Sequence, residues 1–571
     1  MRPAKLLMFF FKRFSKRYYS EGIRESVKNM AIAETSEKYR AISAAEFFYK
    51  YKEIAGFANP ARALYQTIRE LVENALDATD AHGILPNIKI VIEKADQVHE
   101  YYKITVEDNG IGLPPHIVPE AFGRVLFSSK YVLRQTRGMF GLGVKVAVLY
   151  GQMTTGRPVE IITSQPGLKR IYYYKLRIDI NKNAPIIVER GSWRKNRDWH
   201  GTIVSLTIEG DWSRAKSRIK EYILRTAVVT PYANIVFITP DGEIQYFKRV
   251  IEKLPKPPKE VKPHPYGVDL EMLKRIRELG KYSTLYEMLI KSFQSIGDVT
   301  ARNIIEKAEL KPEIDPSKLS DKQLLKLVNA MKTYEKYRPP TADALSPLGP
   351  DVIKAGLQRI YKPEFVEAVT RRPAAYQGHP FIVEVGIAYG GKVPTSPQDR
   401  PILLRYANKI PLLYDEGSDV VTKVIKDART CRDEEKRKGY CFDWNNYLVA
   451  LPAPILVLVH ICSTKVPFKG VGKESIADVD EIRREVKLAL LEAARKLRNY
   501  LSKKIREEEK KKKIVNLAKY IPEVARALNI IASNSVDYEE ILEKLVTIVA
   551  SRVGLDPTEV KKVVESVEIG V

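Results

Sequence analysis

The chain has 571 residues, which is enough for several domains, and its 44% hydrophobic and 29% charged residues are typical of a soluble globular protein. Three cysteines are too few for a disulfide scaffold, and no apolar run reaches transmembrane length, so small disulfide-rich folds and membrane spans are excluded. The formal net charge of +25 suggests a polyanionic partner, nucleic acid first. The alternative explanation is that all proteins of the source organism are basic, and we favour the partner.

The first 42 residues form a basic N-terminal extension. Its first twenty residues contain no acid and carry an apolar cluster at Leu6–Phe11. A targeting presequence or a membrane-surface helix has this composition. We favour a third interpretation, in which the start codon is assigned too early and the true start lies near Met30.

A helix opening at Asn59-Pro60 carries the first candidate site, after a short helix in 43–60 with a capping-box pair at Ser43 and Glu46. Apolar residues recur along it at steps of three and four, namely Leu64, Ile68, Leu71, Ala75 and Ala78. Glu70, Asn74 and Asp77 share a neighbouring stripe. Such a polar stripe usually means a solvated face, but a carboxylate and an amide one turn apart can also activate water and hold a divalent metal.

Two strands, Ile88–Ile92 and Ile104–Val106, precede the turn Asp108-Asn109-Gly110-Ile111-Gly112. Two glycines at this spacing, ending with Gly112, allow the backbone to approach a ligand closely. Asp108 at the strand end is placed to accept a hydrogen bond from an exocyclic amine. The common alternative is a plain hairpin turn.

A glycine-rich loop, Gly138–Gly143, follows the Arg-, Ser- and Lys-rich segment Phe122–Arg137 and leads into a helix at Val144–Tyr150. Free amides at a helix N-terminus form a phosphate cradle, to which Lys130 and Lys145 add charge. The loop follows no strand, as a Rossmann loop does, and lacks the Gly-Lys-Ser/Thr of a P-loop, so it would hold phosphates in a third way.

The rest of the chain divides at two proline-rich boundaries, 255–265 and 337–340. Strands before the first boundary are expected at 159–163, 172–180, 203–208 and 234–238, with a helix at 218–227. Between the boundaries, 269–335 is helical with a turn at Ser295–Thr300. Helix–turn–helix geometry with basic flanks binds phosphate backbones, although any small helical bundle gives this pattern.

A second α/β unit follows, with strands at 381–389, 402–407 and 455–462 and helices at 351–360 and 416–426. A lysine-rich loop then leads to a long helix from about Ser475 past Tyr500, a charged solvated run at 507–513 and a helical tail. Cys431 and Cys441 are close enough in sequence to bridge, although so few cysteines also fit a reducing interior.

The motifs in chain order, Glu70-x-x-x-Asn74, Asp108-x-Gly-x-Gly112, Gly138-x-x-Gly141-x-Gly143 and Gly201-Thr202, resemble the Bergerat (GHKL) ATP-binding fold of gyrase, MutL, histidine kinases and large heat-shock chaperones. Further segments resemble the B subunits of type IIB topoisomerases, the topoisomerase VI family. These are 59–66, 124–130, 152–156, 368–378, 414–419 and 466–468.

The resemblance implies a multidomain α+β and α/β fold. A Bergerat ATPase domain at 43–254, with helices on one face of a mixed sheet, is followed by a helix-two-turns-helix domain at 255–338. A transducer domain at 339–505 ends in a long helix, and 506–571 is a charged helical tail.

The resemblance also implies the role of each site residue. Glu70 matches the general base, with Glu73 the next candidate, and Asn74 matches the Mg²⁺ ligand. Asp108, Gly112 and Thr202 match the adenine site. The phosphate-wrapping lid comprises Ser129, Lys130, Gly138, Met139, Phe140, Gly141, Leu142, Gly143, Val144 and Lys145, with Met139 and Phe140 replacing a polar pair. Lys473 matches the γ-phosphate lysine, Lys465 is its rival, and Asp77 braces the pocket.

The function implied is that of an ATP-hydrolysing subunit. It closes as an ATP-driven homodimeric clamp on double-stranded DNA and gates passage of one duplex through a break made by an A subunit, in an A2B2 assembly that relaxes and decatenates DNA. The expected location is cytoplasmic and nucleoid-associated, with no membrane. The alternative is a clamp or chaperone of the same fold without a topoisomerase partner. A histidine kinase is disfavoured because no single histidine sits in a dimerising helical hairpin.

Overall fold

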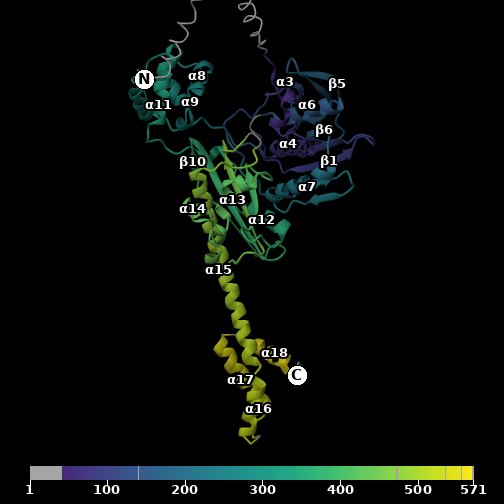
Figure 1. The fold of residues 1–571 in the computed structure, drawn as a ribbon, viewed down its shortest axis with the longest axis vertical. Helices are drawn as coiled ribbons and strands as arrows, with labels where there is room; N and C mark the ends of the chain where they lie inside the picture. Colours follow the sequence, from purple (N-terminus) through teal and green to yellow (C-terminus); the bar gives the residue numbers. More distant parts are fainter. Residues whose placement is uncertain (1–40, 139–140, 471–472, 534, 555, 569–571) are drawn as a thin grey trace, which may run out of the picture.

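The computed structural model describes residues 41–138, 141–470, 473–533, 535–554 and 556–568 (Figure 1). The proposed start near Met30, nearly all of the predicted extension 1–42, and the lid residues Met139 and Phe140 lie outside the described residues. Within the described residues, no helix is both long enough and apolar enough to cross a membrane.

The first sheet has eight strands in the order β5-β4-β3-β6-β2-β1-β7-β8. Its strands are β1 (Asn87–Lys94), β2 (Tyr101–Asp108), β3 (Val159–Ser164), β4 (Arg170–Asp179), β5 (Ala184–Arg194), β6 (Gly201–Glu209), β7 (Asn234–Ile238) and β8 (Ile244–Phe247). The β1–β7 pair is parallel and the other neighbouring pairs are antiparallel, which confirms the predicted mixed sheet.

Helices cover this sheet. They are α3 (Ala44–Lys50), α4 (Pro60–Asp80), α5 (Val118–Gly123), α6 (Gly143–Thr155) and α7 (Trp212–Val229). Helices α4 and α6 contact β6 and each other, and α7 packs on α4, so α4 is central to this layer. The side chain of Ser43 caps α3 by accepting from the Glu46 amide, as the predicted pair requires. The side chain of Asn59 caps α4 by accepting from the amide of Arg62.

Two strands of this sheet were not predicted from the sequence, and both lie at its edges. In β5, Ile186, Ile187 and Val188 are all exposed, so the strand lacks the alternation that a half-buried strand shows. Strand β8 is only four residues long. The helix predicted at 218–227 is longer in the structure, where it is α7. It begins at Trp212 because the Asp211 side chain caps it by accepting from the Arg214 amide.

The region between the proline-rich boundaries is helical, as predicted. It contains α8 (Leu270–Leu279), α9 (Leu285–Ser292), α10 (Asp298–Lys307) and α11 (Asp321–Lys332). These helices share a hydrophobic core of their own, built around buried residues such as Leu289, Ile304 and Leu327. The predicted turn lies between α9 and α10.

The second sheet has six strands. The order is β10-β11-β14-β12-β13, and β9 pairs with β11. The strands are β9 (Phe365–Thr370), β10 (Ala374–Tyr376), β11 (His379–Tyr389), β12 (Ile402–Ala407), β13 (Ile410–Pro411) and β14 (Ile455–Ser463), and the helices are α12 (Pro350–Tyr361), α13 (Val420–Ile425), α14 (Asp433–Arg437) and α15 (Asp480–Ala518). The short strands β9, β10 and β13 were not predicted.

Two helix predictions in this unit need correction. The helix expected at 416–426 is interrupted, because the Asp419 side chain accepts from the Val421 amide and starts α13 there. The long helix begins at Asp480 rather than near Ser475. Ile476 is instead held in a β-bridge with Phe468, which keeps this part of the chain extended.

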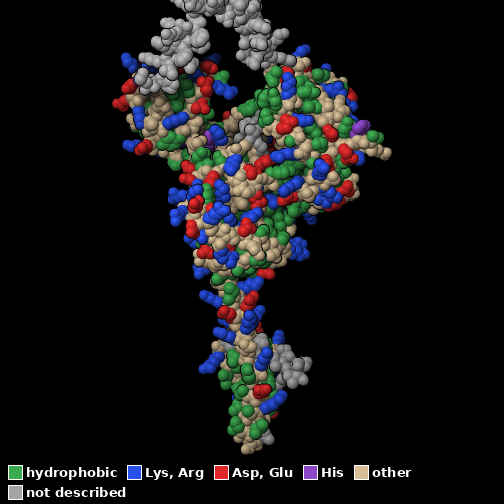
Figure 2. Space-filling model, in the orientation of Figure 1, with side chains coloured by type: hydrophobic (Ala, Val, Ile, Leu, Met, Phe, Trp, Pro, Cys, Tyr) green, Lys and Arg blue, Asp and Glu red, His purple; other side chains and the backbone are tan. Residues whose placement is uncertain are grey.

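Helix α15 forms a stem that leads away from the two sheets (Figure 1). The charged run 507–513 lies within it and is exposed, as predicted. Basic and acidic side chains line the visible face of the stem (Figure 2). The tail helices are α16 (Ile521–Ile531), α17 (Tyr538–Val553) and α18 (Pro557–Glu568), and they pack on the end of α15 around a small core that includes Ala525 and Val546.

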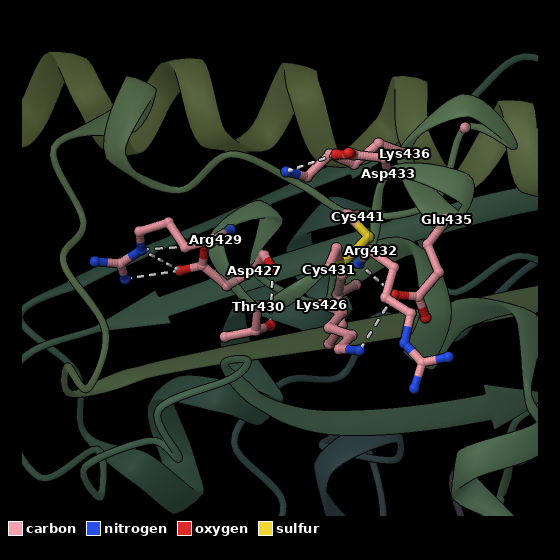
Figure 3. The surroundings of a disulfide bond; sticks show 12 residues. Lys426, Asp427, Arg429, Thr430, Cys431, Arg432, Asp433, Glu435, Lys436 and Cys441 are labelled. Carbon is pink, nitrogen blue, oxygen red and sulfur yellow. Dashed lines mark hydrogen bonds and ion pairs between the residues drawn. A yellow bond between two sulfur atoms is a disulfide. The ribbon is translucent and has the colours of Figure 1, made fainter.

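Cys431 and Cys441 are joined in a disulfide with an S–S distance of 2.06 Å (Figure 3). The bridge spans α14 and lies among charged side chains, including Arg432 and Glu435 (Figure 3). The pairing departs from the fully reduced interior that the low cysteine count suggested. Cys462 is free and buried.

Candidate functional site

One cavity of about 730 Å³ lies between α4, the turn after β2, the glycine-rich loop and the second sheet's unit. Every predicted site residue that the structure describes lines it. These residues are Glu70, Asn74, Asp108, Gly112, Ser129, Lys130, Gly138, Gly141, Leu142, Gly143, Val144, Lys145, Thr202 and Lys473. Residues distant in the sequence therefore converge on one space.

Glu70 faces the cavity from the middle of α4. Its Oε1 accepts a hydrogen bond from Gln66 Nε2 at 2.9 Å. Burial and the Glu73 carboxylate raise the pKa of Glu70, against the opposing charges of Arg69 and Lys473. Glu73, the rival base, does not line the cavity and is held by Arg69 in a buried ion pair of 2.7 Å.

Gly143, the first residue of α6, lies directly against Glu70. A Cβ atom built on Gly143 would be 1.7 Å from Glu70 Oε2. Only glycine therefore allows the N-terminus of α6 to approach the carboxylate this closely. The packing fixes the geometry between the candidate base and the lid.

Asn74 and Asp77, one turn further along α4, both contact Lys130. The Lys130 Nζ lies 2.9 Å from Asn74 Oδ1 and 2.6 Å from Asp77 Oδ2. Asp77 also accepts from Arg137 Nη1 at 3.0 Å. Burial alone would raise the pKa of Asp77, but the Lys130 and Arg137 charges outweigh burial and hold that pKa below its usual value. Asp77 thus connects α4 to residues 129–138, which lead into the predicted lid loop and are called the lid segment below.

Asp80, at the end of α4, is a functional candidate that the sequence did not reveal. Its Oδ2 accepts from Arg137 Nη2 at 2.7 Å, Tyr232 OH at 3.1 Å and Lys409 Nζ at 3.4 Å. Lys409 lies in the turn between β12 and β13, so this oxygen joins α4, the lid segment and the second sheet. No local pattern marks these residues, because their partners come from distant segments.

The Lys409 turn is itself held by a buried polar chain in the second sheet. The Lys409 amide donates to His460 Nε2 at 2.9 Å, and His460 Nδ1 lies 2.7 Å from Glu384 Oε2. Glu384 also accepts from the amides of Leu348 and Gly349. Cys462 lies close to His460 and Glu384, and these three residue types can bind a metal. Because the side chains of His460 and Glu384 already have protein hydrogen-bond partners, we interpret the group as structural.

Asp108 and Thr202 lie side by side because β2 and β6 pair in the register Asp108↔Thr202. Asp108 Oδ1 accepts from the Gly110 amide at 2.8 Å. Burial raises the pKa of the Asp108 carboxyl to about 7, although the Gly110 and Thr202 amides oppose the shift. Thr163, which the sequence did not single out, lies 3.3 Å from Thr202, hydroxyl to hydroxyl.

Gly112 is required by its close approach to a neighbouring strand. Its φ is +69°, and an added Cβ would lie 2.1 Å from the Ser164 carbonyl oxygen. The turn after Asp108 can therefore fold against β3 only with glycine at this position.

Two lysines of the cavity have shifted acidities. Burial and the Lys130 charge lower the pKa of Lys145 to about 8, and its Nζ donates to the Phe127 carbonyl at 3.0 Å. Burial also lowers the pKa of Lys473, against the opposing charge of Glu70. Lys465 is exposed and does not line the cavity. The second sheet's unit therefore brings Lys473, and not Lys465, to the Glu70 carboxylate.

Two family models match parts of this chain. Residues 59–180 match the family described as histidine kinase-, DNA gyrase B- and HSP90-like ATPase, and residues 340–513 match the topoisomerase VI B subunit transducer. The B subunit of type 2 DNA topoisomerase 6 from Sulfurisphaera tokodaii is 52% identical over 543 residues, covering 94% of this chain and 99% of that protein. The protein of the same name from Metallosphaera sedula is 53% identical over 527 residues, covering 91% and 96%.

The ATPase region of Saccharomyces cerevisiae topoisomerase II aligns with 82% of this chain and 99% of its own, with a TM-score of 0.38 and 13% identity. The curated relatives, in contrast, match along almost their whole length. The chain therefore belongs to the family of type 2 DNA topoisomerase 6 B subunits, which are ATP-hydrolysing topoisomerase subunits.

Proposed function

We propose that the cavity binds ATP and hydrolyses it to drive a DNA-passage clamp. The observation that carries this proposal is the meeting of Glu70, from α4, with Lys473, from the loop between β14 and α15, in one cavity. We assign nucleotide binding to 43–254, DNA contact to 255–338, force transmission to 339–505 and partner contact to 506–571.

In this mechanism Glu70 orients the attacking water and accepts its proton. Its raised pKa makes it a stronger base than an ordinary carboxylate, and Gln66 holds its other oxygen. Phosphoryl transfer otherwise requires positioning and charge compensation. Lys130, Lys145 and Lys473 supply positive charge, and the amides at the N-terminus of α6 face the phosphates.

The residues present suit a Mg²⁺ ion at Asn74. Mg²⁺ bound with a nucleotide takes few protein ligands and keeps waters and phosphate oxygens. Asn74 is exposed, and its Oδ1 already contacts a cation, the Lys130 ammonium. Asn74 would hold the metal, which would neutralise part of the phosphate charge. Lys130 would then keep Asp77 as its protein partner.

Asp108 and Thr202 would bind the adenine base. The Asp108 carboxylate accepts from the exocyclic amine, and the Thr202 hydroxyl, held by Thr163, completes the contact. Gly112 keeps the turn clear of the base. Because a guanine presents an oxygen at the position of this amine, an ionised Asp108 also selects ATP over GTP.

Hydrolysis changes the contacts of Lys473, because this residue touches the γ-phosphate from another domain. ATP and its products therefore favour different angles between the two domains. We propose that ATP closes two B subunits around one DNA duplex. The net charge of +25 supports DNA contact through phosphates. The protein would act where the DNA is, at the nucleoid.

Strand cleavage would belong to an A subunit, in an A2B2 assembly. The tail offers a surface for it, because α16 exposes an apolar set that includes Val524, Leu528, Ile530 and Ile531. Hydrophobic side chains are prominent on this end of the molecule (Figure 2). The sequence contains an Asp-x-Asp pair, Asp478 and Asp480, a spacing that could suggest a cleavage metal. Asp480 begins α15 and pairs with Arg483, so we assign these two carboxylates to helix N-terminal charge instead. Family membership favours this role over that of a chaperone or free-standing clamp.

The function is tested by reconstitution with a matching A subunit. With ATP, the wild-type chain is expected to relax supercoiled plasmid, and Glu70→Ala to lose relaxation and lower ATP turnover at least 100-fold while nucleotide affinity stays near wild type. Gel analysis of plasmid, phosphate release and equilibrium binding measure these outcomes. Absence of relaxation by the wild type would contradict the topoisomerase role, and full turnover by Glu70→Ala would move the base to Glu73.

The two lysine candidates are separated by matched substitutions. Lys473→Met is expected to lower kcat for ATP hydrolysis on the order of 10- to 100-fold, because a charged donor to the transferred phosphoryl group is lost. Lys465→Met is expected to keep wild-type kcat, since its side chain is exposed outside the cavity. Steady-state phosphate release measures both, and the reverse result would assign the role to Lys465.

Nucleotide affinity is expected to depend on the ionisation of Asp108. The ionised carboxylate accepts from the adenine amine more strongly than the neutral acid does, and with a pKa of about 7 the ionised fraction falls roughly tenfold between pH 8 and pH 6. The Kd of a non-hydrolysable ATP analogue should therefore rise by up to about tenfold as the pH is lowered from 8 to 6. Asp108→Asn controls for titration of the phosphates and should lack this component. Parallel pH profiles for the two proteins would refute the adenine role of Asp108.

The approach of Gly143 to Glu70 is tested by Gly143→Ala. The added methyl must displace Glu70 or α6, and overpacking of this kind costs about 1–3 kcal/mol, so kcat should fall about tenfold or more. Gly191→Ala is the matched control, because an added Cβ there meets nothing within 4 Å. Phosphate release and thermal unfolding of both variants measure the effect. Wild-type turnover by Gly143→Ala would show that the lid and Glu70 are not packed this way during catalysis.

A further inference from the structure

The loop that presents Lys473 is anchored at its base to its own domain. Ser475 Oγ donates to Asp415 Oδ2 at 2.6 Å, and the Ile476 amide donates to Asp419 Oδ2 at 2.9 Å. The Lys469 amide donates to the Ser475 carbonyl at 3.1 Å, which closes the loop on itself. These contacts fix where the loop starts and ends, while Lys473 and Glu474 face α4.

Arg62, in the first turn of α4, contacts two transducer segments: the loop that carries Lys473 and the segment around Tyr414 that anchors this loop. Its guanidinium forms an ion pair with the Glu474 carboxylate, next to Lys473 in the chain. The same guanidinium lies over the Tyr414 ring, 5.0 Å from its centroid, and Tyr414 directly precedes Asp415. Arg62 therefore binds the loop tip and the segment that anchors the loop base.

The ring of Tyr414 is held from the ATPase side by further groups. Arg218 of α7 lies 5.3 Å from its centroid, and Tyr65 of α4 meets it edge-on at 5.4 Å. Arg62 is thus backed by a preformed aromatic contact, which limits the rotamers that its long side chain can adopt. Glu474 therefore pairs with an Arg62 side chain whose position is already restricted by Tyr414.

Glu70 lies eight residues after Arg62 on the same helix, which is roughly 12 Å along its axis. A rigid helix therefore carries the candidate base at one point and the contact to Glu474 at another. A shift of α4 relative to the transducer would change the Glu70–Lys473 separation and the Arg62–Glu474 pair together. Arg62 has no need to touch the nucleotide to affect its hydrolysis.

We propose that Arg62 is a positioning residue for Lys473. By pairing with Glu474 and stacking on Tyr414, it holds the loop tip against α4 so that the Lys473 ammonium points at the γ-phosphate. The inference rests on the proposed role of Lys473. The Arg62 and Glu474 side chains are 34% and 25% exposed, so the pair is weak and its loss should cost less than the loss of Lys473 itself.

The experiment compares Arg62→Gln, Glu474→Gln, and the charge exchange Arg62→Glu with Glu474→Arg, each in the full chain with and without Lys473→Met. Each neutral variant should lower kcat for ATP three- to tenfold. It should weaken binding of a non-hydrolysable ATP analogue more than binding of ADP, since ADP lacks the γ-phosphate. In the Lys473→Met background, Arg62→Gln should change kcat less than twofold, because it acts through Lys473.

The charge exchange should recover at least half of the kcat lost by Arg62→Glu alone. Lys103→Glu is the matched control: Lys103 on β2 pairs with Glu160 on β3 at 3.2 Å, with an exposure similar to that of the Arg62–Glu474 pair, and loss of this pair should leave kcat unchanged. Thermal unfolding midpoints of the Arg62 and Glu474 variants close to that of the wild type would show that the loss of kcat is not a folding defect. Recovery of kcat in the charge exchange would show the same.

Several outcomes would overturn the proposal. These are wild-type kcat in Arg62→Gln, equal weakening of ADP and analogue binding, a full multiplicative loss in the Lys473→Met background, or no recovery in the charge exchange. If Lys473→Met itself keeps wild-type kcat, the proposed role of Lys473 fails and this inference fails with it. If Lys473→Met loses turnover but Arg62→Gln acts independently, only the positioning role fails.

Discussion

The carboxylate of Asp80 holds helix α4, the lid segment and the transducer to one another. Its Oδ2 receives hydrogen bonds from Arg137 and Lys409, which come from two different parts of the chain. Burial alone would raise the pKa of Asp80, but these positive charges outweigh burial and keep that pKa low. Because removing one member of a buried charge group leaves the others uncompensated, the three parts are constrained to stay together.

The same region also orients positive charge beside the cavity. Asp77 holds Lys130 and Arg137 next to the cavity, so contacts within the protein orient these positive groups. Preorganised charges contribute more to catalysis than charges that must be recruited, since little reorganisation is needed when the reaction occurs. In the proposed mechanism, Asp77 and Asp80 therefore support the site by holding the basic residues in place.

The sequence predicted those parts of the site that are local in the chain. Helical spacing put Glu70, Asn74 and Asp77 on one stripe of α4, and Asp108 stood out at a strand end, but each motif alone had a common structural explanation. Only the four motifs in chain order pointed to one site, and the described residues of those motifs line one cavity. Asp80 and Lys409 were missed because their significance arises only when two sheets come together. The start of α15 at Asp480 was also missed, since a tertiary β-bridge, rather than helix propensity, decides it.

Helix α15 extends the transducer far from the two sheets (Figure 1). An uninterrupted helix of 39 residues is about 58 Å long at 1.5 Å per residue. A rigid lever of that length moves its far end by about 10 Å for each 10° of rotation at its base. The charged run 507–513 keeps the lever soluble without breaking it. If ATP hydrolysis changes the angle between the ATPase domain and the transducer, as proposed above, this lever would convert a small rotation at its base into a much larger displacement at the tail.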